Sequence, residues 1–331
     1  MWDPDLIFDT SKNYFTEHVG ERVLAPTWGG YKDMKEIPLS LSYLQEAKRA
    51  GMKITPLLHN DFDLQETKKL LHDSGAVQNL ARQITATALV YDFDGWNLDF
   101  ENMDEADKFL YTKFIKIVSE KLHMHGKEIS VDVTVNSNSP NWSLCYDRKG
   151  MAAYVDYEVI MGYDQTPGGS RYSGPVSSYS WLKHHIAMLL KQVPNNKLVL
   201  GLPFYTRIWT GKEGQAASSV LITKQIKSLL GQNNVGLFWN PEDRQYVGIW
   251  EENGQTRKVW LEERRSLQEK VSLAHDYKLA GLAFWRYGFE TEDIYDQIEG
   301  AFLNKKDESV RYKNRSEDIL IKFRERLKRE Q

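Results

Sequence analysis

An amide and two carboxylates occupy every second position of one short segment, as Asn97, Asp99 and Glu101. The residues between them are apolar, and this period of two predicts a strand with all three polar groups on one face. Such a face is costly in a folded protein unless chemistry or a hydrogen-bond network uses it. The apolar run 88–91 just before it predicts a buried parallel strand over residues 89–99. We therefore expect a catalytic site at the C-terminal end of that strand.

The same segment resembles the signature of the family 18 glycoside hydrolases, Asp-Gly-x-Asp-x-Asp-x-Glu. Here it reads Asp94-Gly95-Trp96-Asn97-Leu98-Asp99-Phe100-Glu101. Asn97 departs from the usual Asp, and in this respect the chain resembles the spore-peptidoglycan branch, the cortex-lytic N-acetylglucosaminidases, more than the chitinases. Glu101 is intact, whereas the lectin-like members of the family lose that residue.

The resemblance implies substrate-assisted retaining hydrolysis, in which the sugar's own 2-acetamido carbonyl attacks the anomeric carbon and forms an oxazolinium ion. The spacing agrees, because residues two apart on a strand lie about 6.5–7 Å apart on one side and cannot flank a glycosidic bond. Glu101 is then the acid and later the base, while Asp99 orients the acetamido group and stabilises the cation. Asn97 is expected to donate a hydrogen bond to Asp99. With one carboxylate fewer in the site, Asp99 should stay ionised without sharing a proton.

Two further motifs resemble the family at the ends of later strands. Residues 161–164 resemble its Met-x-Tyr-Asp, in which Tyr163 would bind the acetamido oxygen and Asp164 would face the substrate. Residues 201–207 resemble its Gly-x-Pro-x-Tyr-x-Arg, which makes Tyr205 and Arg207 expected subsite contacts.

Three more residues are expected to contact substrate. Trp285 ends the last predicted strand, where the family has a Trp that forms the floor under the sugar. Trp28 and Asn60 follow the second and third predicted strands, and they are chosen by that position alone. The chitinase motif Ser-x-Gly-Gly is missing at the third strand, where residues 57–60 read Leu-Leu-His-Asn, and this again favours a substrate other than chitin.

The elements that must position these residues follow from the hydropathy pattern. Short apolar runs alternate with longer amphipathic segments, which predicts the α/β class and a (β/α)8 TIM barrel. The expected strands cover residues 2–8, 22–27, 52–58, 89–99, 128–135, 156–163, 197–204 and 280–285. The expected helices cover residues 39–50, 104–125, 179–192 and 266–277.

Three regions follow from these elements. Residues 1–210 and 263–303 are expected to form the catalytic barrel. Residues 211–262 form an α+β insertion with an antiparallel meander that turns at Asn253-Gly254. The resemblance implies that this insertion forms one wall of the substrate groove. Residues 304–331 are densely charged and are expected to form a helical tail.

The composition excludes several classes of function. A net charge of −3 gives no basic surface for nucleic acid, and no apolar stretch is long enough to span a membrane. The single Cys145 and the absence of metal or nucleotide motifs lead us to expect no metal and no cofactor. The chain is expected to be a monomer. The N-terminus does not resemble a signal peptide. Localisation therefore stays open between the cytoplasm and, if an export segment is missing, the cell envelope, the spore or the outside.

The expected partner is a polysaccharide that contains N-acetylglucosamine. The leading hypothesis is a retaining hydrolase of β-linked N-acetylglucosamine bonds in peptidoglycan or spore cortex. The first alternative is a chitinase or chitobiase that acts on chitin oligomers. The second is a barrel that binds carbohydrate without turnover, and the intact Glu101 argues against it.

Overall fold

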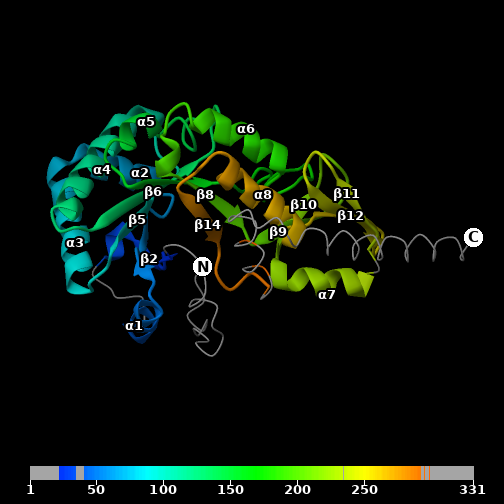
Figure 1. Cartoon of the computed structure of the whole chain (residues 1–331). Helices are drawn as coiled ribbons and strands as arrows, with labels where there is room; N and C mark the ends of the chain where they lie inside the picture. The colour runs from blue at the N-terminus through cyan, green and yellow to red at the C-terminus, as the bar shows by residue number, and fades with distance from the viewer. Residues whose placement is uncertain (1–21, 35–40, 234, 292–293, 295–297, 299–331) are drawn as a thin grey trace, which may run out of the picture.

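The computed structural model describes residues 22–34, 41–233, 235–291, 294 and 298. Seven parallel strands form its main sheet, in the order β14-β8-β7-β6-β5-β4-β2. Their bounds are β2 Thr27–Gly30, β4 Leu57–His59, β5 Gly95–Asp99, β6 Glu128–Thr134, β7 Tyr157–Met161, β8 Leu198–Pro203 and β14 Gly281–Trp285. The sheet curls in the manner of a (β/α)8 barrel, which confirms the predicted fold class (Figure 1). The predicted first strand, residues 2–8, and the predicted tail, residues 304–331, lie outside the described residues.

A short parallel pair precedes two of these strands. It consists of β1 Val23–Leu24 and β3 Lys53–Ile54. Pro26 and Pro56 stand between this pair and the strands β2 and β4 that follow. Proline has no backbone N–H to donate, so each proline marks a break in the ladder at that point.

Most of the helices cover the outer side of the main sheet, whereas α7 lies against the insertion (Figure 1). They are α1 Leu41–Arg49, α2 Leu64–His72, α3 Ser74–Val90, α4 Lys108–His123, α5 Arg148–Met151, α6 Tyr179–Leu189, α7 Thr223–Asn233 and α8 Arg264–Asp276. Three short 3₁₀ turns, η1 Tyr31–Asp33, η2 Glu105–Asp107 and η3 Asn195–Lys197, complete the helical segments. The structure confirms the helices predicted over 39–50, 104–125, 179–192 and 266–277, within the usual error at their ends. Within the described part of the chain, no helix is long and apolar enough to cross a membrane.

The predicted start of the strand that carries Asp99 was wrong. The apolar run 88–91, taken as the start of a strand, is the last turn of α3, and Val90 is 74% exposed there. The strand β5 begins only at Gly95. Asp73 begins this helix by accepting hydrogen bonds from the N–H groups of Gly75 and Ala76. A run of only four apolar residues fits a buried strand and the end of a helix equally well, so periodicity alone could not assign it, although Asp92 and Asp94 separate it from β5.

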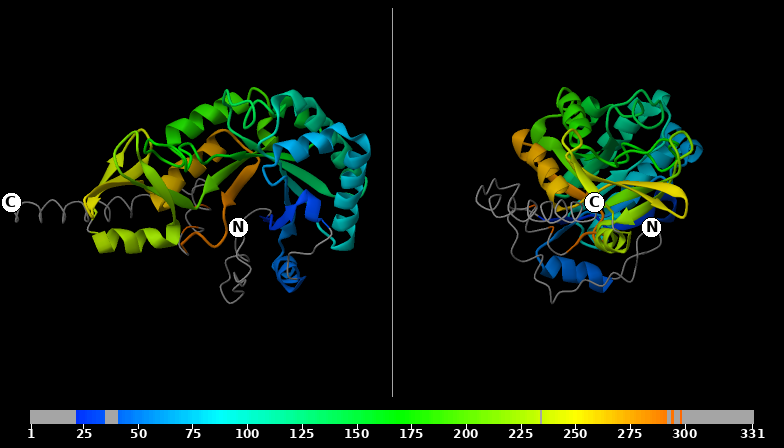
Figure 2. Two further views of the ribbon diagram at one scale, coloured as in Figure 1. Left: turned by 180° about the vertical axis from the view of Figure 1, so that it is seen from behind. Right: turned by 90° about the vertical axis from the view of Figure 1, so that its right-hand side faces the viewer.

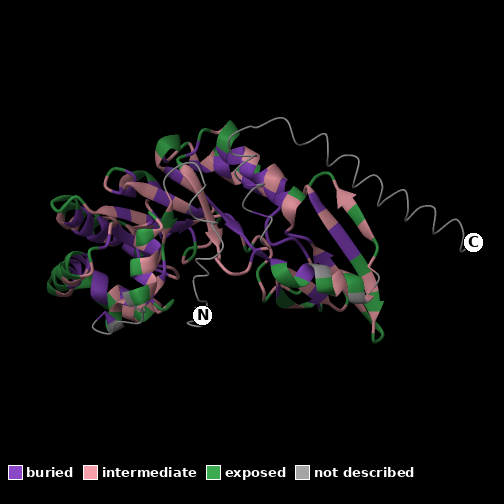
Figure 3. Ribbon diagram, turned by 60° about the horizontal axis from the view of Figure 1, so that its bottom comes forward, coloured by how far each residue is buried: buried purple, intermediate pink, exposed green. Residues whose placement is uncertain are grey.

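The main core lies between the sheet and helices α3 and α4. Buried residues gather along the strands and on the helix faces that cover them, while exposed residues mark the outer faces (Figure 3). The indole N–H of Trp96 donates to the carbonyl oxygen of Ile84 in α3 at 2.9 Å, so this large buried side chain leaves no unsatisfied donor.

The insertion is an antiparallel sheet of five strands in the order β10-β9-β13-β12-β11. Its strands are β9 Tyr205–Thr210, β10 Ala217–Ile222, β11 Leu237–Asn240, β12 Gln245–Glu252 and β13 Gln255–Trp260. The predicted meander and its Asn253-Gly254 turn are confirmed, with φ of 53° and 72° at the two turn residues. The sheet and α7 project beyond one end of the barrel (Figure 2). β9 follows β8 after the single residue Phe204, so this sheet already begins at Tyr205 and not at residue 211.

Candidate active site

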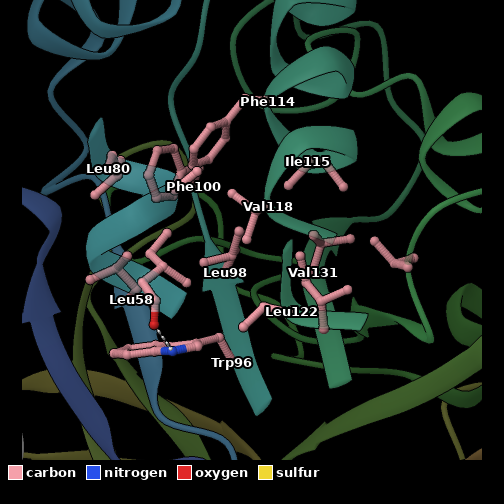
Figure 4. Close-up of a cluster of buried hydrophobic side chains, with 14 of the residues drawn as sticks. Leu58, Leu80, Trp96, Leu98, Phe100, Phe114, Ile115, Val118, Leu122 and Val131 are labelled. Carbon is pink, nitrogen blue, oxygen red and sulfur yellow. Dashed lines mark hydrogen bonds between the residues drawn. The ribbon is translucent and has the colours of Figure 1, made fainter. Parts of the chain in front are cut away.

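Strand β5 divides its side chains between the core and the inside of the barrel. Trp96, Leu98 and Phe100 point into the apolar cluster, against side chains that include Leu80 of α3 and Phe114 of α4 (Figure 4). Because side chains alternate along a strand, the polar residues of the same segment, Asn97, Asp99 and Glu101, point the opposite way. The structure thus brings the three predicted residues to the inner face, at the C-terminal edge of the sheet.

Glu101 lies just beyond β5 and is only partly exposed. Burial, and then the negative charges of Asp99 and Asp164, raise the pKa of its carboxyl group to about 8. A carboxylic acid with this pKa is mostly protonated at neutral pH and can serve as a general acid.

Asn60 fixes the backbone of Glu101. Its side-chain amide donates to the Glu101 carbonyl at 2.7 Å and to the Thr67 hydroxyl at 2.9 Å, and its oxygen accepts from the Glu101 N–H at 3.0 Å. The side chain is 1% exposed. The structure therefore differs from the expected substrate contact: Asn60 lies behind the acid and positions it.

Asn97 contacts Asp132 of the neighbouring strand. Its amide donates to Asp132 Oδ2 at 2.9 Å, and its oxygen accepts from the Ser130 hydroxyl at 2.8 Å. The expected hydrogen bond from Asn97 to Asp99 is not among the bonds that Asn97 makes, because its amide is turned sideways across the sheet. The expectation that Asn97 leaves the site with one carboxylate fewer than the family signature was therefore wrong, because Asp132 of β6 supplies a carboxyl group in its place.

Asp132 is a site residue that was not predicted, although the sequence contains a signal for it. Strand β6 alternates polar and apolar residues, with Ser130, Asp132 and Thr134 between Ile129, Val131 and Val133. This is the same period of two that identified β5.

Asp99 has an acceptor without a partner. Its Oδ1 is buried and makes no hydrogen bond within the described part of the chain. Burial raises the pKa of this carboxyl group to about 7. Tyr163 belongs to the same cluster: burial, and then the charges of Asp132 and Asp99, raise the pKa of its hydroxyl group, which stays protonated and able to donate.

A second polar group forms around Asp164. The Tyr205 hydroxyl donates to Asp164 Oδ1 at 2.9 Å, and the Arg207 guanidinium reaches the same oxygen at 3.4 Å. Tyr205 also contacts Tyr163 edge to face, with ring centroids 6.3 Å apart. The structure thus brings four predicted residues together, namely Tyr163, Asp164, Tyr205 and Arg207. This group lies close enough to Glu101 for the charge of Asp164 to raise the pKa of its carboxyl group.

The two predicted tryptophans occupy different environments. Trp285 ends β14, partly buried, and its carbonyl accepts a hydrogen bond from the Phe204 N–H at 2.8 Å. It therefore lies at the same edge of the sheet as Asp99. Trp28 is 3% exposed and packs edge to face against Phe93 and Trp96. This placement corrects the expectation for Trp28, because its ring belongs to the core and has no free face for a sugar.

Two exposed aromatic side chains at this edge were also missed. Phe62, after β4, and Trp142, after β6, lie with their ring centroids 6.0 Å apart. Asn102, next to Glu101, donates to the Phe62 carbonyl at 2.8 Å. Both aromatics lie in irregular segments, so periodicity gives no signal for them.

The residues of this cluster can provide acid catalysis and hydrogen bonds. Among the residues that the structure describes, no group of three or more His, Cys, Asp or Glu side chains could hold a metal ion.

The chain is similar to several bacterial glycosylases. It is 26% identical to the glycosylase YvbX of Bacillus subtilis, over 77% of this chain and 76% of that protein. It is also 26% identical to the cortical fragment-lytic enzyme of Bacillus subtilis, over 72% of this chain and 56% of that enzyme, so the match spans little more than half of that relative.

Solved structures share the fold. A chitinase from Chromobacterium violaceum superposes with a TM-score of 0.78 at 20% identity, covering 85% of this chain and 91% of that one. The spore cortex-lytic enzyme SleL of Bacillus cereus gives a TM-score of 0.79 at 22% identity, covering 88% and 69%. The profile of the glycosyl hydrolases family 18 matches residues 40–290, most of the chain. The protein therefore belongs to family 18 of the glycosyl hydrolases and is a glycosidase.

Proposed function

We propose that this glycosidase cleaves β-linked N-acetylglucosamine bonds with retention of configuration, by substrate-assisted catalysis, in peptidoglycan of the spore-cortex type. The observation that carries the proposal is the pairing of Asp99 and Glu101 on one side of β5. Glu101 has the pKa of an acid that is protonated at neutral pH, and Asp99 has a free buried acceptor beside it.

The free acceptor fits a substrate N–H. A buried carboxylate oxygen without a partner is costly, and an acetamido N–H can satisfy it. With its N–H bound by Asp99, the acetamido group presents its carbonyl oxygen to the anomeric carbon, and the protonated hydroxyl of Tyr163 can donate to that oxygen. Glu101 then protonates the leaving oxygen and later accepts a proton from water.

Asp164 offers a different nucleophile, and its hydrogen bonds argue against that role. Its Oδ1 accepts from Tyr205 and lies near the Arg207 guanidinium. A carboxylate stabilised in this way is a weak nucleophile but a well-oriented acceptor for a sugar hydroxyl. We assign Asp164, Tyr205 and Arg207 to substrate binding, together with Trp285 as the aromatic floor.

The substrate assignment rests on the relatives and on one residue. The cortical fragment-lytic enzymes of Bacillus match this chain, and Asn97 replaces the Asp of the family signature. A probable chitinase of Drosophila melanogaster, 26% identical over 64% of this chain, supports chitin oligomers as the second candidate substrate. The exposed pair Phe62 and Trp142 could stack on either polymer, because both present flat sugar faces.

The decisive experiment is the configuration of the first product. Proton NMR of the sugar released from a β-linked substrate, recorded before mutarotation, should give the β-anomer. A matched substrate without the N-acetyl group should react negligibly, and a thiazoline analogue of the cyclic intermediate should inhibit. An initial α-anomer would exclude the mechanism. Incubation with purified cortex peptidoglycan and with chitin, followed by assay of new reducing ends, separates the two substrates.

A further inference from the structure

The register of the sheet brings two carboxyl groups side by side. Strands β5 and β6 pair in parallel, with Asn97 opposite Ser130 and Leu98 opposite Val131. Continued by one residue, this register brings Asp132 beside Asp99. Neighbouring strands lie about 4.8 Å apart, and residues in register point to the same face. The side chains of Ser130 and Asn97, two residues before Asp132 and Asp99 on the same strands, are hydrogen-bonded to each other and so point to the same face of the sheet.

The side chain of Asp132 is buried and hydrogen-bonded to Asn97. It is 7% exposed and Asn97 is 6% exposed. The Asn97 amide donates to Oδ2 of Asp132, so a proton carried by Asp132 belongs on Oδ1. No Lys, Arg or His among the described residues forms an ion pair with Asp132. Two buried carboxylates this close, without a cation, cannot both ionise at neutral pH without a large cost.

The other titratable groups around Asp132 do not remove this cost. Glu101 and Asp99 from the β5 segment add negative charge. Burial, and then the charges of Asp99 and Asp132, raise the pKa of the hydroxyl groups of Tyr163 after β7 and Tyr111 of α4, so neither group offers a positive charge. Burial, and then the charge of Asp99, raise the pKa of Asp132 well above its usual range.

We propose that Asp132 is a positioning residue that forms a coupled carboxyl pair with Asp99, with one proton between them, and so supplies from β6 the carboxyl group that Asn97 lacks on β5. In the substrate complex the proton resides on Asp132, and Asp99 carries the single negative charge that faces the acetamido N–H. This role rests on the proposed function of Asp99, whereas the shared proton itself can be tested without turnover.

The first test is NMR of the carboxyl carbons of aspartate in the folded protein, as a function of pH. A coupled pair gives two resonances that each titrate in two steps. In Asp132→Asn one of them disappears, and the remaining Asp99 signal should lose the step that follows Asp132, while it keeps its own step and its response to the ionisation of Glu101. Two resonances in the wild type that titrate independently, each in one step near the ordinary value, would overturn the proposal.

The second test is the pH profile of kcat/KM for Asp132→Asn. In the wild type the first negative charge can form on either carboxyl group of the pair. In the variant it must form on buried Asp99 alone, which is less favourable, so the acid limb of the profile should move to higher pH. When the second proton leaves the pair, the added negative charge raises the pKa of Glu101 and helps to keep it protonated. Asp132→Asn cannot form this charge, so the alkaline limb of its profile should move to lower pH. Asp132→Ala also removes the acceptor of Asn97, and it should lower kcat/KM by about 10- to 100-fold, the value of one hydrogen bond to a charged group.

The matched control moves the carboxyl group back to β5. Asn97→Asp combined with Asp132→Asn retains the hydrogen bond in reverse and restores two carboxyl groups, so both limbs should return toward wild type. Ser130→Ala removes the other hydrogen bond of Asn97 without changing a carboxyl group, and its limbs should stay in place. A profile of Asp132→Asn that superimposes on wild type would leave Asp132 a purely structural role and refute the inference.

The two proposals fail separately. Coupled titration in a protein that releases no sugar would contradict the proposed function and leave the carboxyl pair intact. Turnover with the β-anomer as first product, together with independent titration of Asp99, would contradict only the role of Asp132.

Discussion

The alkaline limit of activity should report the protonation of Glu101. Burial and the charges of Asp99 and Asp164 raise the pKa of this carboxyl group to about 8, against an ordinary value of 4.5. At pH 7 the site therefore holds about ten protonated molecules for each ionised one, whereas an ordinary Glu would be protonated in only about one molecule in 300. Raising the pH from about 7 to about 9 should reverse this ratio and reduce the acid-dependent rate roughly tenfold.

Two substrates with the same sugar but different leaving groups give the assay. An N-acetylglucosamine oligomer has a poor leaving group that needs the proton of Glu101, so its kcat/KM should fall above a pH of about 8. An aryl glycoside with a nitrophenolate leaving group needs no protonation in the first step, and its profile should stay nearly flat in that range. Glu101→Gln should abolish the limb, with a loss of about 10²- to 10⁴-fold on the oligomer.

A limb near the ordinary value of 4.5 would refute this reasoning, because the burial and charges around Glu101 would then have no effect. The same conclusion follows if Glu101→Gln hydrolyses the oligomer at the wild-type rate, since the acid would then be another residue. An equal limb with both substrates would assign it to a group that acts in binding and not in protonation of the leaving group.

Three further predictions follow from contacts in the site. Asn60→Leu removes the hydrogen bonds that hold the backbone of Glu101, and urea denaturation should give a loss of about 2–4 kcal/mol in unfolding free energy, with kcat reduced more than KM is raised. Equal stability would mean that Asn60 does not hold the acid. Asn97→Asp adds a carboxylate at the place where the Asn97 amide lies 2.9 Å from Asp132. A carboxyl group whose pKa is raised in the folded state favours folding at low pH, so the unfolding free energy of this variant should fall below wild type as pH rises from about 5 to about 9. Parallel stability curves would contradict the contact. Trp142→Ala removes one exposed aromatic of the proposed polymer surface and should raise KM for long oligomers about 2- to 12-fold without changing turnover of a short aryl substrate. An unchanged KM for long oligomers would exclude Trp142 from substrate binding.

The barrel and its acid could be predicted from the sequence because both rest on local patterns. Alternation along β5 determines which residues share a face: Trp96, Leu98 and Phe100 point into the core, so Asp99 and Glu101 point to the inner side as expected. The insertion meander followed from its Asn253-Gly254 turn, which requires positive φ at both positions.

The errors have a common physical cause in contacts between elements. The partner of Asn97 is set by the register between β5 and β6, which the pattern of a single strand does not contain. Trp28 follows a strand end, as a substrate contact would, but its ring packs on the helix side against Phe93 and Trp96. Asn60 faces the backbone of Glu101 because β4 lies beside β5. Each of these depends on lateral neighbours that are far away in the chain.

The passage of β8 into β9 limits how this enzyme can be re-engineered. Removing residues 211–262 as a cassette would take away β10 and β13, which pair with β9 on its two sides. The remaining stub would then carry two open edges, which invite aggregation. Tyr205 and Arg207 would remain in the chain but lose the sheet that aims them at Asp164. A chimaera intended to change substrate range should therefore exchange residues 205–262 as one unit, and should bring a matching residue for position 164 from the same donor.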